Sequence, residues 1–101
     1  MTALAWGEVE GQEFTGAEAR SASDFGEVLF NHALDADEGW AMFKDRPLTT
    51  GQRLFLAAKA ESMDTMAGLL LAEPDARVRA VLTKRMEAER GRESGGIVYR
   101  A

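Results

Sequence analysis

Apolar residues recur at helical spacing along most of the chain after residue 23, and acidic or proline-containing breaks separate the runs. The first run begins at Phe25 and continues at positions i+3, i+4, i+7 and i+8, the spacing of one helix face. Asp24 and Glu27 have the spacing of a capping pair at its start. A shorter apolar face follows the break at 35–37 and stops before Pro47. The two stripes consist of Phe25, Val28, Leu29, His32 and Ala33, and of Ala36, Trp40 and Phe43.

Three more helices are expected between residues 50 and 92. Thr49 or Thr50 caps the first of them, which is apolar nearly all round and should be the most buried element. Ser62 caps the next helix, and Pro74 fits the first turn of the last one. Gly91 and the "ESGG" segment are expected to end that helix. The stripes of the last two helices consist of Met63, Met66, Ala67, Leu70 and Leu71, and of Val78, Val81, Leu82 and Met86.

Both ends of the chain lack this periodicity. Glycines interrupt the first 22 residues, where Thr15 and Glu18 have capping-box spacing for a short helical turn. The last residues, "IVYRA", are apolar enough to dock, and we expect a strand beside the N-terminal segment. A chain of 101 residues forms one modest core. The sequence therefore predicts a mainly α single domain over 1–101, with an irregular arm or short strands at 1–22, a compact bundle of about five short helices at 23–92, and a loop and docked tail at 93–101.

A helical repeat is an alternative to this bundle, because "EVLFNHAL", "RLFLAAKA" and "RAVLTKRM" align at a spacing of 26 residues. The stretch "LLAEPDARVRAVLTKR" resembles the unit of HEAT-like and leucine-rich-variant repeat proteins. The resemblance is carried by Leu70, Leu71, Glu73, Pro74, Asp75, Val78, Arg79, Val81, Leu82 and Arg85. It implies helix packing and a binding surface rather than a reaction. It covers one unit well and a second poorly, fewer than the roughly three that sustain a solenoid, so we expect repeat-like packing inside a compact domain.

The net charge of −5 is distributed unevenly. Residues 1–50 hold ten acids and three bases, whereas residues 51–101 hold seven acids and nine bases. An acidic half steers association with a basic partner and disfavours nucleic acid, although acidic surfaces also serve solubility alone. The chain has no cysteine, no export signal and no apolar run near the roughly twenty residues that span a bilayer. We therefore expect a cytoplasmic protein with no membrane contact.

The sequence contains no recognisable catalytic motif. His32 is the only histidine and lies near acidic residues at 35–38, so it could bind a metal or share a proton. A structural role on its apolar stripe is the alternative, and no second histidine or cysteine is present to complete a metal site. No serine has a nucleophile-elbow context, and no glycine motif cradles phosphate. We expect neither an enzyme nor a bound cofactor or metal.

Two further groups of residues have competing interpretations. The last helix is basic, which indicates either a nucleic-acid-binding face or bases that pair with acids of the N-terminal half. We favour internal pairing for these bases, which are Arg77, Arg79, Lys84, Arg85, Arg90 and Arg92. Four of the five methionines could form either an adaptable binding groove or part of the hydrophobic core, and we favour the core. They are Met42, Met63, Met66 and Met86.

The functional hypothesis is a small acidic protein–protein interaction module whose partner is a larger basic protein or ribonucleoprotein. It would act as an inhibitor that occludes a nucleic-acid-binding surface, as do phage-encoded inhibitors of bacterial defence complexes, immunity proteins and antitoxins. Carboxylates would steer the encounter and a tryptophan would anchor it. The predicted partner-binding residues are Trp6, Glu8, Glu10, Glu13, Glu18, Asp35, Asp37, Glu38 and Trp40. The alternatives are a scaffold or assembly subunit that joins a complex or self-associates, and a nucleic-acid binder through the basic last helix.

Overall fold

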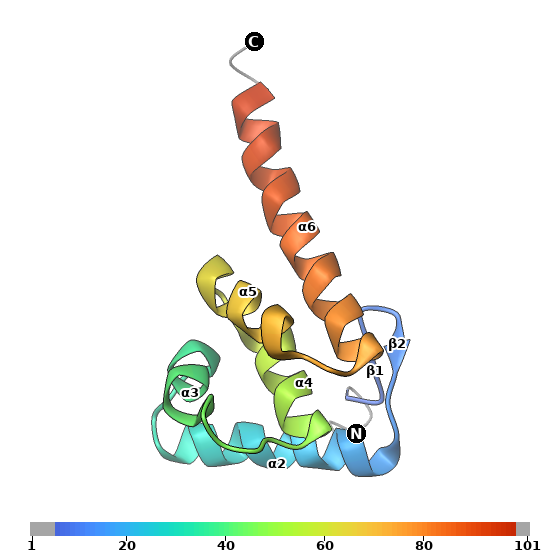
Figure 1. Ribbon diagram of the computed structural model, residues 1–101, viewed down its shortest axis with the longest axis vertical. Coiled ribbons are helices and arrows are strands. Elements are labelled where there is room, and N and C mark those ends of the chain that lie inside the picture. The colour runs from blue at the N-terminus through green and yellow to red at the C-terminus, as the bar shows by residue number, and fades with distance from the viewer. Residues whose placement is uncertain (1–5, 99–101) are drawn as a thin grey trace.

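Five helices and one two-stranded hairpin make up the fold in a computed structural model, which describes residues 6–98, and the side chains of residues 6–91 (Figure 1). The predicted mainly α class with a short-β N-terminal segment is confirmed. The molecule measures 48 × 27 × 26 Å because the last helix extends beyond the rest (Figure 1). The elements are β1 (Glu8–Val9), β2 (Gln12–Glu13), α2 (Gly16–Asn31), α3 (Ala36–Phe43), α4 (Thr50–Lys59), α5 (Met63–Ala72) and α6 (Ala76–Val98).

The hairpin is closed by a two-residue turn. β1 and β2 are antiparallel, with Glu8 directly opposite Glu13. Glu10 and Gly11 form the turn with φ values of 50° and 83°, the left-handed conformation that two-residue hairpin turns require. Val9 packs against the core. Because successive strand residues face opposite sides, Glu8 and Glu13 share the outer face of the hairpin.

Helix α2 begins nine residues earlier than the apolar pattern predicts, at Gly16 and not at Phe25. The Thr15 hydroxyl accepts the Glu18 N–H at 3.1 Å, and the Glu18 carboxylate accepts the Thr15 N–H at 2.8 Å. This reciprocal capping box satisfies two N–H groups at the start of the helix, which then runs without a break from Gly16. The predicted capping pair at Asp24 is therefore wrong, and so is the predicted start of the helical body at residue 23.

The core surrounds α4, as predicted for the most buried element. Leu54, Leu56 and Ala57 are completely buried, and α2, α3, α5 and α6 all pack against this helix. Because the core forms around one central helix, the compact alternative holds and successive helix pairs do not stack as a solenoid. The other helices contribute mainly Ala22, Phe25, Leu29, Met66, Leu69, Val78, Val81 and Leu82.

Some predicted core positions lie on the surface. Val28 of α2 is 46% exposed and Leu71 of α5 is 90% exposed, although the apolar spacing predicts that both lie on buried helix faces. His32 and Ala33 are also exposed, at the C-terminal end of α2. The buried face of α2 instead contains Ala19, Ala22, Phe25 and Leu29. Since α4 covers only that face, the side of α2 that carries Val28 stays open.

Helix α6 starts later and ends later than the sequence indicates. Asp75 caps it by accepting the N–H groups of Arg77 and Val78, so Pro74 precedes the cap instead of occupying the first turn. The helix continues through Gly91 to Val98, so the predicted loop from residue 93 is wrong and the predicted strand of the tail is wrong at 97–98. Glycine weakens a helix by about 1 kcal/mol relative to alanine, but it keeps the N–H that proline lacks. Residues 1–5 and 99–101 of the predicted arm and tail lie outside the described residues.

Candidate functional site

The structure brings three of the predicted partner-binding residues together around one surface hollow. This hollow has a volume of about 340 Å³ and lies between the hairpin and the C-terminal end of α4. Trp6, Glu8 and Glu10 line one side, so an indole and two carboxylates border the same space. Ala58 and Lys59 of α4 line the other side.

Trp6 anchors the segment before the hairpin to the core. Its indole packs against the Phe55 ring with the ring centroids 5.5 Å apart. The ammonium of Lys59 lies over the indole, 5.9 Å from the ring centroid. Trp6 is only half-buried in this position. The indole therefore caps the core and already contacts a cation.

The hairpin carboxylates form no ion pair within the part of the chain that the structure describes. The side chains of Glu8, Glu10 and Glu13 are exposed, and none takes part in an ion pair with another described residue. Glu8 and Glu13 are a like-charged cross-strand pair, which destabilises a hairpin by roughly 0.2–1 kcal/mol. Glu10 adopts a left-handed conformation that favours glycine or asparagine. Neutral residues would therefore stabilise this hairpin better than the three glutamates.

Glu18 belongs to a structural cluster centred on Arg77. The Arg77 guanidinium contacts Glu18 and Asp75 at 2.8 Å each and donates to the Glu13 carbonyl at 3.1 Å. It also lies over the Phe14 ring, 4.8 Å from the centroid. Hydrogen bonds from Arg77 lower the pKa of Glu18 and lower that of Asp75 to about 2. This Arg77 clamp ties the start of α6 to the N-terminal half, the internal pairing favoured for that base.

The carboxylates around α3 cap helices. Asp35 and Glu38 form the capping box that starts α3, with both hydrogen bonds at 2.8 Å. Asp37 accepts the N–H groups of Glu61 and Ser62 at 3.0 and 3.2 Å, which joins α3 to the start of α5. Burial raises the pKa of Asp37, but these backbone hydrogen bonds, together with the Thr65 side chain and the charge of Arg85, hold the pKa below its usual value. All three carboxylates thus have structural roles.

Trp40 also belongs to the body of the protein. Its indole packs directly against Gly68 of α5, where an added Cβ would lie only 3.3 Å from the indole nitrogen. Figure 1 places α3, which carries Trp40, at the opposite end of α2 from the hairpin. The nine predicted partner-binding residues therefore do not form one surface, and Trp6, Glu8 and Glu10 are the ones that border the hollow beside the hairpin.

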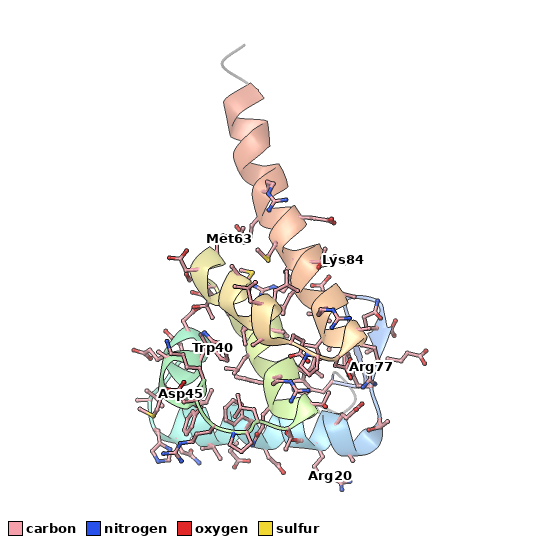
Figure 2. The ribbon with its side chains drawn as sticks, viewed as in Figure 1. Arg20, Trp40, Asp45, Met63, Arg77 and Lys84 are labelled. Atoms are coloured by element: carbon pink, nitrogen blue, oxygen red, sulfur yellow. The ribbon has the colours of Figure 1, made fainter. Side chains whose placement is uncertain are left out.

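The basic side chains of α6 are partly used within the fold. Arg85 donates to the Ala57 carbonyl at 2.8 Å, and Arg79 donates to the Glu73 carbonyl at 2.9 Å. Lys84 and Arg90 are exposed, and Figure 2 shows Lys84 on the extended part of α6. The Arg92 side chain lies outside the described residues. With the Arg77 clamp also engaged, few bases remain to form a continuous nucleic-acid-binding face.

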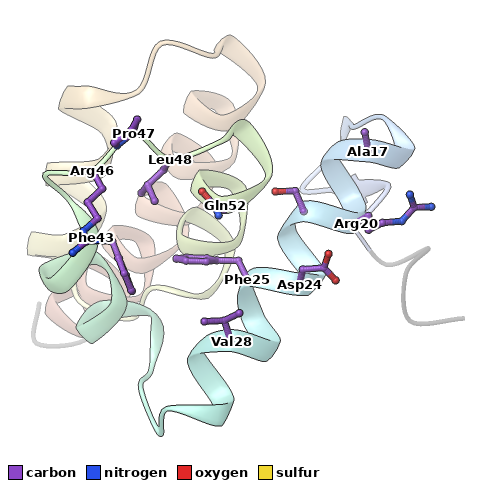
Figure 3. Close-up of a pocket in the computed structure, with 11 residues that line it drawn as sticks. Ala17, Arg20, Asp24, Phe25, Val28, Phe43, Arg46, Pro47, Leu48 and Gln52 are labelled. Atoms are coloured by element: carbon purple, nitrogen blue, oxygen red, sulfur yellow. The ribbon is translucent and has the colours of Figure 1, made fainter.

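A groove that the sequence pattern did not predict runs along α2. It has a volume of about 620 Å³ and lies between α2 and the segment that joins α3 to α4 (Figure 3). A second hollow of about 280 Å³ shares Val28 and Phe43 with it, so the two lie next to each other. The signal in the sequence was Met42, one of the four methionines, which is 58% exposed and lines the second hollow. Together they form the α2–α3 groove, lined by Ala17, Arg20, Ser21, Asp24, Phe25, Val28, Leu29, His32, Leu34, Met42, Phe43, Arg46, Pro47, Leu48 and Gln52.

His32 lies at the C-terminal end of α2, where its ring contacts the backbone of that helix. Its Nδ1 lies 2.8 Å from the carbonyl oxygen of Val28, one turn earlier.

Among the residues that the structure describes, no three His, Asp or Glu side chains are grouped so that they could hold a metal ion. No helix in the described part of the chain is long and apolar enough to cross a membrane. No protein-family model, curated protein or solved structure matches this chain.

Proposed function

We propose that this protein is a protein–protein interaction module that binds a positively charged partner through the anionic hairpin, defined as β1, β2 and the turn between them. The observation that supports this most directly is the hollow at Trp6, Glu8 and Glu10. An arginine side chain from a partner would meet two carboxylates and an aromatic face there. Carboxylates bind guanidinium through charge-assisted hydrogen bonds, and indole binds cations through its ring face.

The stability of the hairpin separates this proposal from a role in solubility alone. Solubility requires only surface charge, and carboxylates at any exposed position supply it. Here the charges occupy a like-charged cross-strand pair, Glu8 and Glu13, and the left-handed turn position of Glu10. Residues kept at a cost to stability are typical of functional sites. Binding therefore explains the positions of these carboxylates better than solubility does.

The partner class that we favour is a protein whose basic surface binds nucleic acid. Such surfaces gather Lys and Arg to neutralise phosphates, and an anionic hairpin offers them a comparable charge. Occupation of such a surface by this protein would exclude the nucleic acid, which is inhibition by occlusion. A complex isolated from lysate at low salt should therefore fail to retain an oligonucleotide that the free partner binds.

Neutralising the hairpin tests the binding surface with a defined probe, a hexa-arginine peptide. Glu8→Gln, Glu10→Asn and Glu13→Gln together should weaken binding of this peptide about tenfold, since exposed ion pairs contribute roughly 0.2–1 kcal/mol each. The free energy of unfolding should rise at the same time, because the like-charged pair and the strained turn are relieved. NMR titration measures the affinity, with the Trp6 indole signal shifting and the Trp40 indole signal as an internal reference.

A matched control carries the same change of net charge at exposed carboxylates outside the hollow. Glu27→Gln, Asp45→Asn and Glu61→Gln together should leave the affinity within about twofold of the wild type, because none of these exposed side chains lines the hollow and solvent and salt weaken their effect on it. Lys59→Gln should strengthen binding, since it removes the cation that already contacts Trp6. If both triple variants weakened binding equally, the hairpin carboxylates would act only through the net negative charge of the protein. That result would refute the proposal.

A further inference from the structure

The α2–α3 groove exposes a complete face of α2. Ala17, Ser21, Asp24, Val28 and His32 follow one another at three- and four-residue steps along it. At about 1.5 Å per residue this face is roughly 22 Å long. A length of about four helical turns exceeds what a small metabolite occupies and matches a helical segment of another protein.

The groove combines apolar and cationic lining residues. Around Val28 the lining is apolar: Met42 and Phe43 of α3 face the end of α2, and Val28 and Met42 are 46% and 58% exposed. Phe25 and Phe43 contact each other edge to face at 5.9 Å where the two hollows meet. Apolar side chains in the groove therefore remain partly exposed to water, as they do in grooves that bind a helix.

The lining of the groove also carries cations. Residues 1–50 contain only three bases, and two of them, Arg20 and Arg46, line this groove. Neither arginine takes part in an ion pair with a described residue. Arg46 lies over the Phe43 ring, 5.7 Å from its centroid, and Figure 3 shows Arg20 extending outward at the rim. Asp24 is the only carboxylate in the lining, which therefore contains two arginines and one acid.

We propose that the α2–α3 groove binds an amphipathic helix of a partner protein, with apolar side chains against Val28, Met42 and Phe43 and carboxylates against Arg20 and Arg46. Charge complementarity identifies this occupant. A helix flanked by lysines would meet the same apolar anchors but would oppose both arginines. The groove shares no residue with the hollow at Trp6, so this surface is separate from the one proposed above.

Two synthetic peptides of about four helical turns test the proposal. Both carry leucines at helical spacing on one face, and these leucines are flanked by glutamates in one peptide and by lysines in the other. The glutamate peptide should bind the wild type at least about fivefold more tightly. This preference opposes the net charge of −5, which by itself would attract the lysine peptide. Fluorescence anisotropy gives the affinities, and NMR signals of the Val28 and Met42 methyl groups report the location.

Variants of the apolar and of the basic lining residues make the assignment specific. Val28→Thr with Met42→Gln keeps the side-chain size at exposed positions and should weaken glutamate-peptide binding about fivefold. Leu71→Gln changes a still more exposed apolar side chain outside the groove and should leave binding unchanged. Arg20→Glu with Arg46→Glu should reverse the preference between the peptides. The thermal unfolding midpoint of each variant verifies that the fold is retained.

A charge-matched control and three outcomes complete the test. Lys84→Glu with Arg90→Glu alters the net charge equally at exposed sites of α6 and should not reverse the preference. Equal or tighter binding of the lysine peptide to the wild type would overturn the proposal, as would binding without a response at Val28 and Met42. Sedimentation that shows a wild-type dimer, converted to a monomer by Met42→Gln, would assign the groove to a second copy of the chain instead.

Discussion

Gly51 lies where α4 passes close to the backbone of α2. A Cβ at this position would collide with the carbonyl oxygen of Glu18 and would lie 2.9 Å from the backbone nitrogen of Ala22. The colliding atoms belong to the backbone of α2, so no side-chain rotation can relieve the contact. The spacing between α2 and α4, and with it the position of the α2–α3 groove, depends on the absence of a side chain here.

Gly51→Ala should therefore lower the free energy of unfolding by about 3 kcal/mol, as expected when a methyl group is forced into a filled contact. Gly16→Ala is the matched control, since no atom lies within 4 Å of an added Cβ at this exposed helix start. We expect it to leave stability unchanged or raise it by about 0.5–1 kcal/mol through helix propensity. Urea unfolding curves of the two variants check both values, and equal stability of the two would contradict the close helix contact.

Residue roles were predictable where the partner is local in sequence. Thr49 and Ser62 cap helices as expected, because each accepts N–H groups only two or three residues ahead. The role of Glu18 was only half visible: its capping spacing with Thr15 is local, but its ion pair with Arg77 spans 59 residues. Asp37 likewise accepts N–H groups from a distant turn. No pattern within one sequence identifies such partners.

At the scale of elements, the Arg77 clamp joins the start of α6 to the N-terminal segment. Its carboxylates have lowered pKa values, so the ionised forms are stabilised in the folded state. A carboxyl group whose folded pKa is depressed adds stability above its unfolded pKa and loses it as the pH falls through the folded pKa. For Asp75 this interval runs from its ordinary value of 3.8 down to about 2.

The unfolding free energy should therefore decrease as the pH falls from about 4.5 to 2, with about 1 kcal/mol of the loss from Asp75 after allowance for solvent screening. Arg77→Gln should flatten this part of the profile, because the carboxylates lose the cation that lowers their pKa values. Arg90→Gln, at an exposed position without a described ion pair, should leave the profile unchanged. Urea unfolding at several pH values makes the comparison, and parallel profiles for wild type and Arg77→Gln would contradict the clamp.

The elements themselves were more predictable than their ends. All five helices follow from apolar spacing, which records burial against neighbours. The start of α2 was misplaced because its first turns bury only alanines, Ala19 and Ala22, which give a weak apolar signal. The end of α6 was misplaced because glycines normally stop helices, whereas this helix continues through Gly91 to Val98. Burial by alanine and tolerance of glycine both depend on the surroundings and not on the local pattern.

At the scale of the whole molecule, two surfaces of different chemistry lie apart. The hollow at the anionic hairpin and the α2–α3 groove have no lining residue in common. The acidic balance of residues 1–50 predicted the first surface in part. It could not predict the second, because the groove forms only when α2 is placed against the segment joining α3 to α4. A module with both surfaces would bring a basic protein and an acidic helix together.

The two surfaces should act independently. Neutralising Glu8, Glu10 and Glu13 should change the affinity for the glutamate peptide by less than about twofold, since charges beyond the Debye length of about 8 Å are largely screened at physiological ionic strength. Arg20→Gln with Arg46→Gln should in turn leave hexa-arginine binding within the same limit. Separate anisotropy titrations with each peptide measure the two effects. A large change in either cross-comparison would show that the surfaces are coupled.

The ammonium of Lys59 over the Trp6 indole has a consequence for ligand choice. The protein supplies a weak internal substitute for the side chain that it is proposed to receive, so binding is an exchange of one cation for another. An incoming lysine would replace a group of its own kind and gain little from the ring. An arginine gains a planar stacking contact and paired hydrogen bonds to a carboxylate, which an ammonium does not offer. The internal lysine thus biases this site toward arginine-rich surfaces.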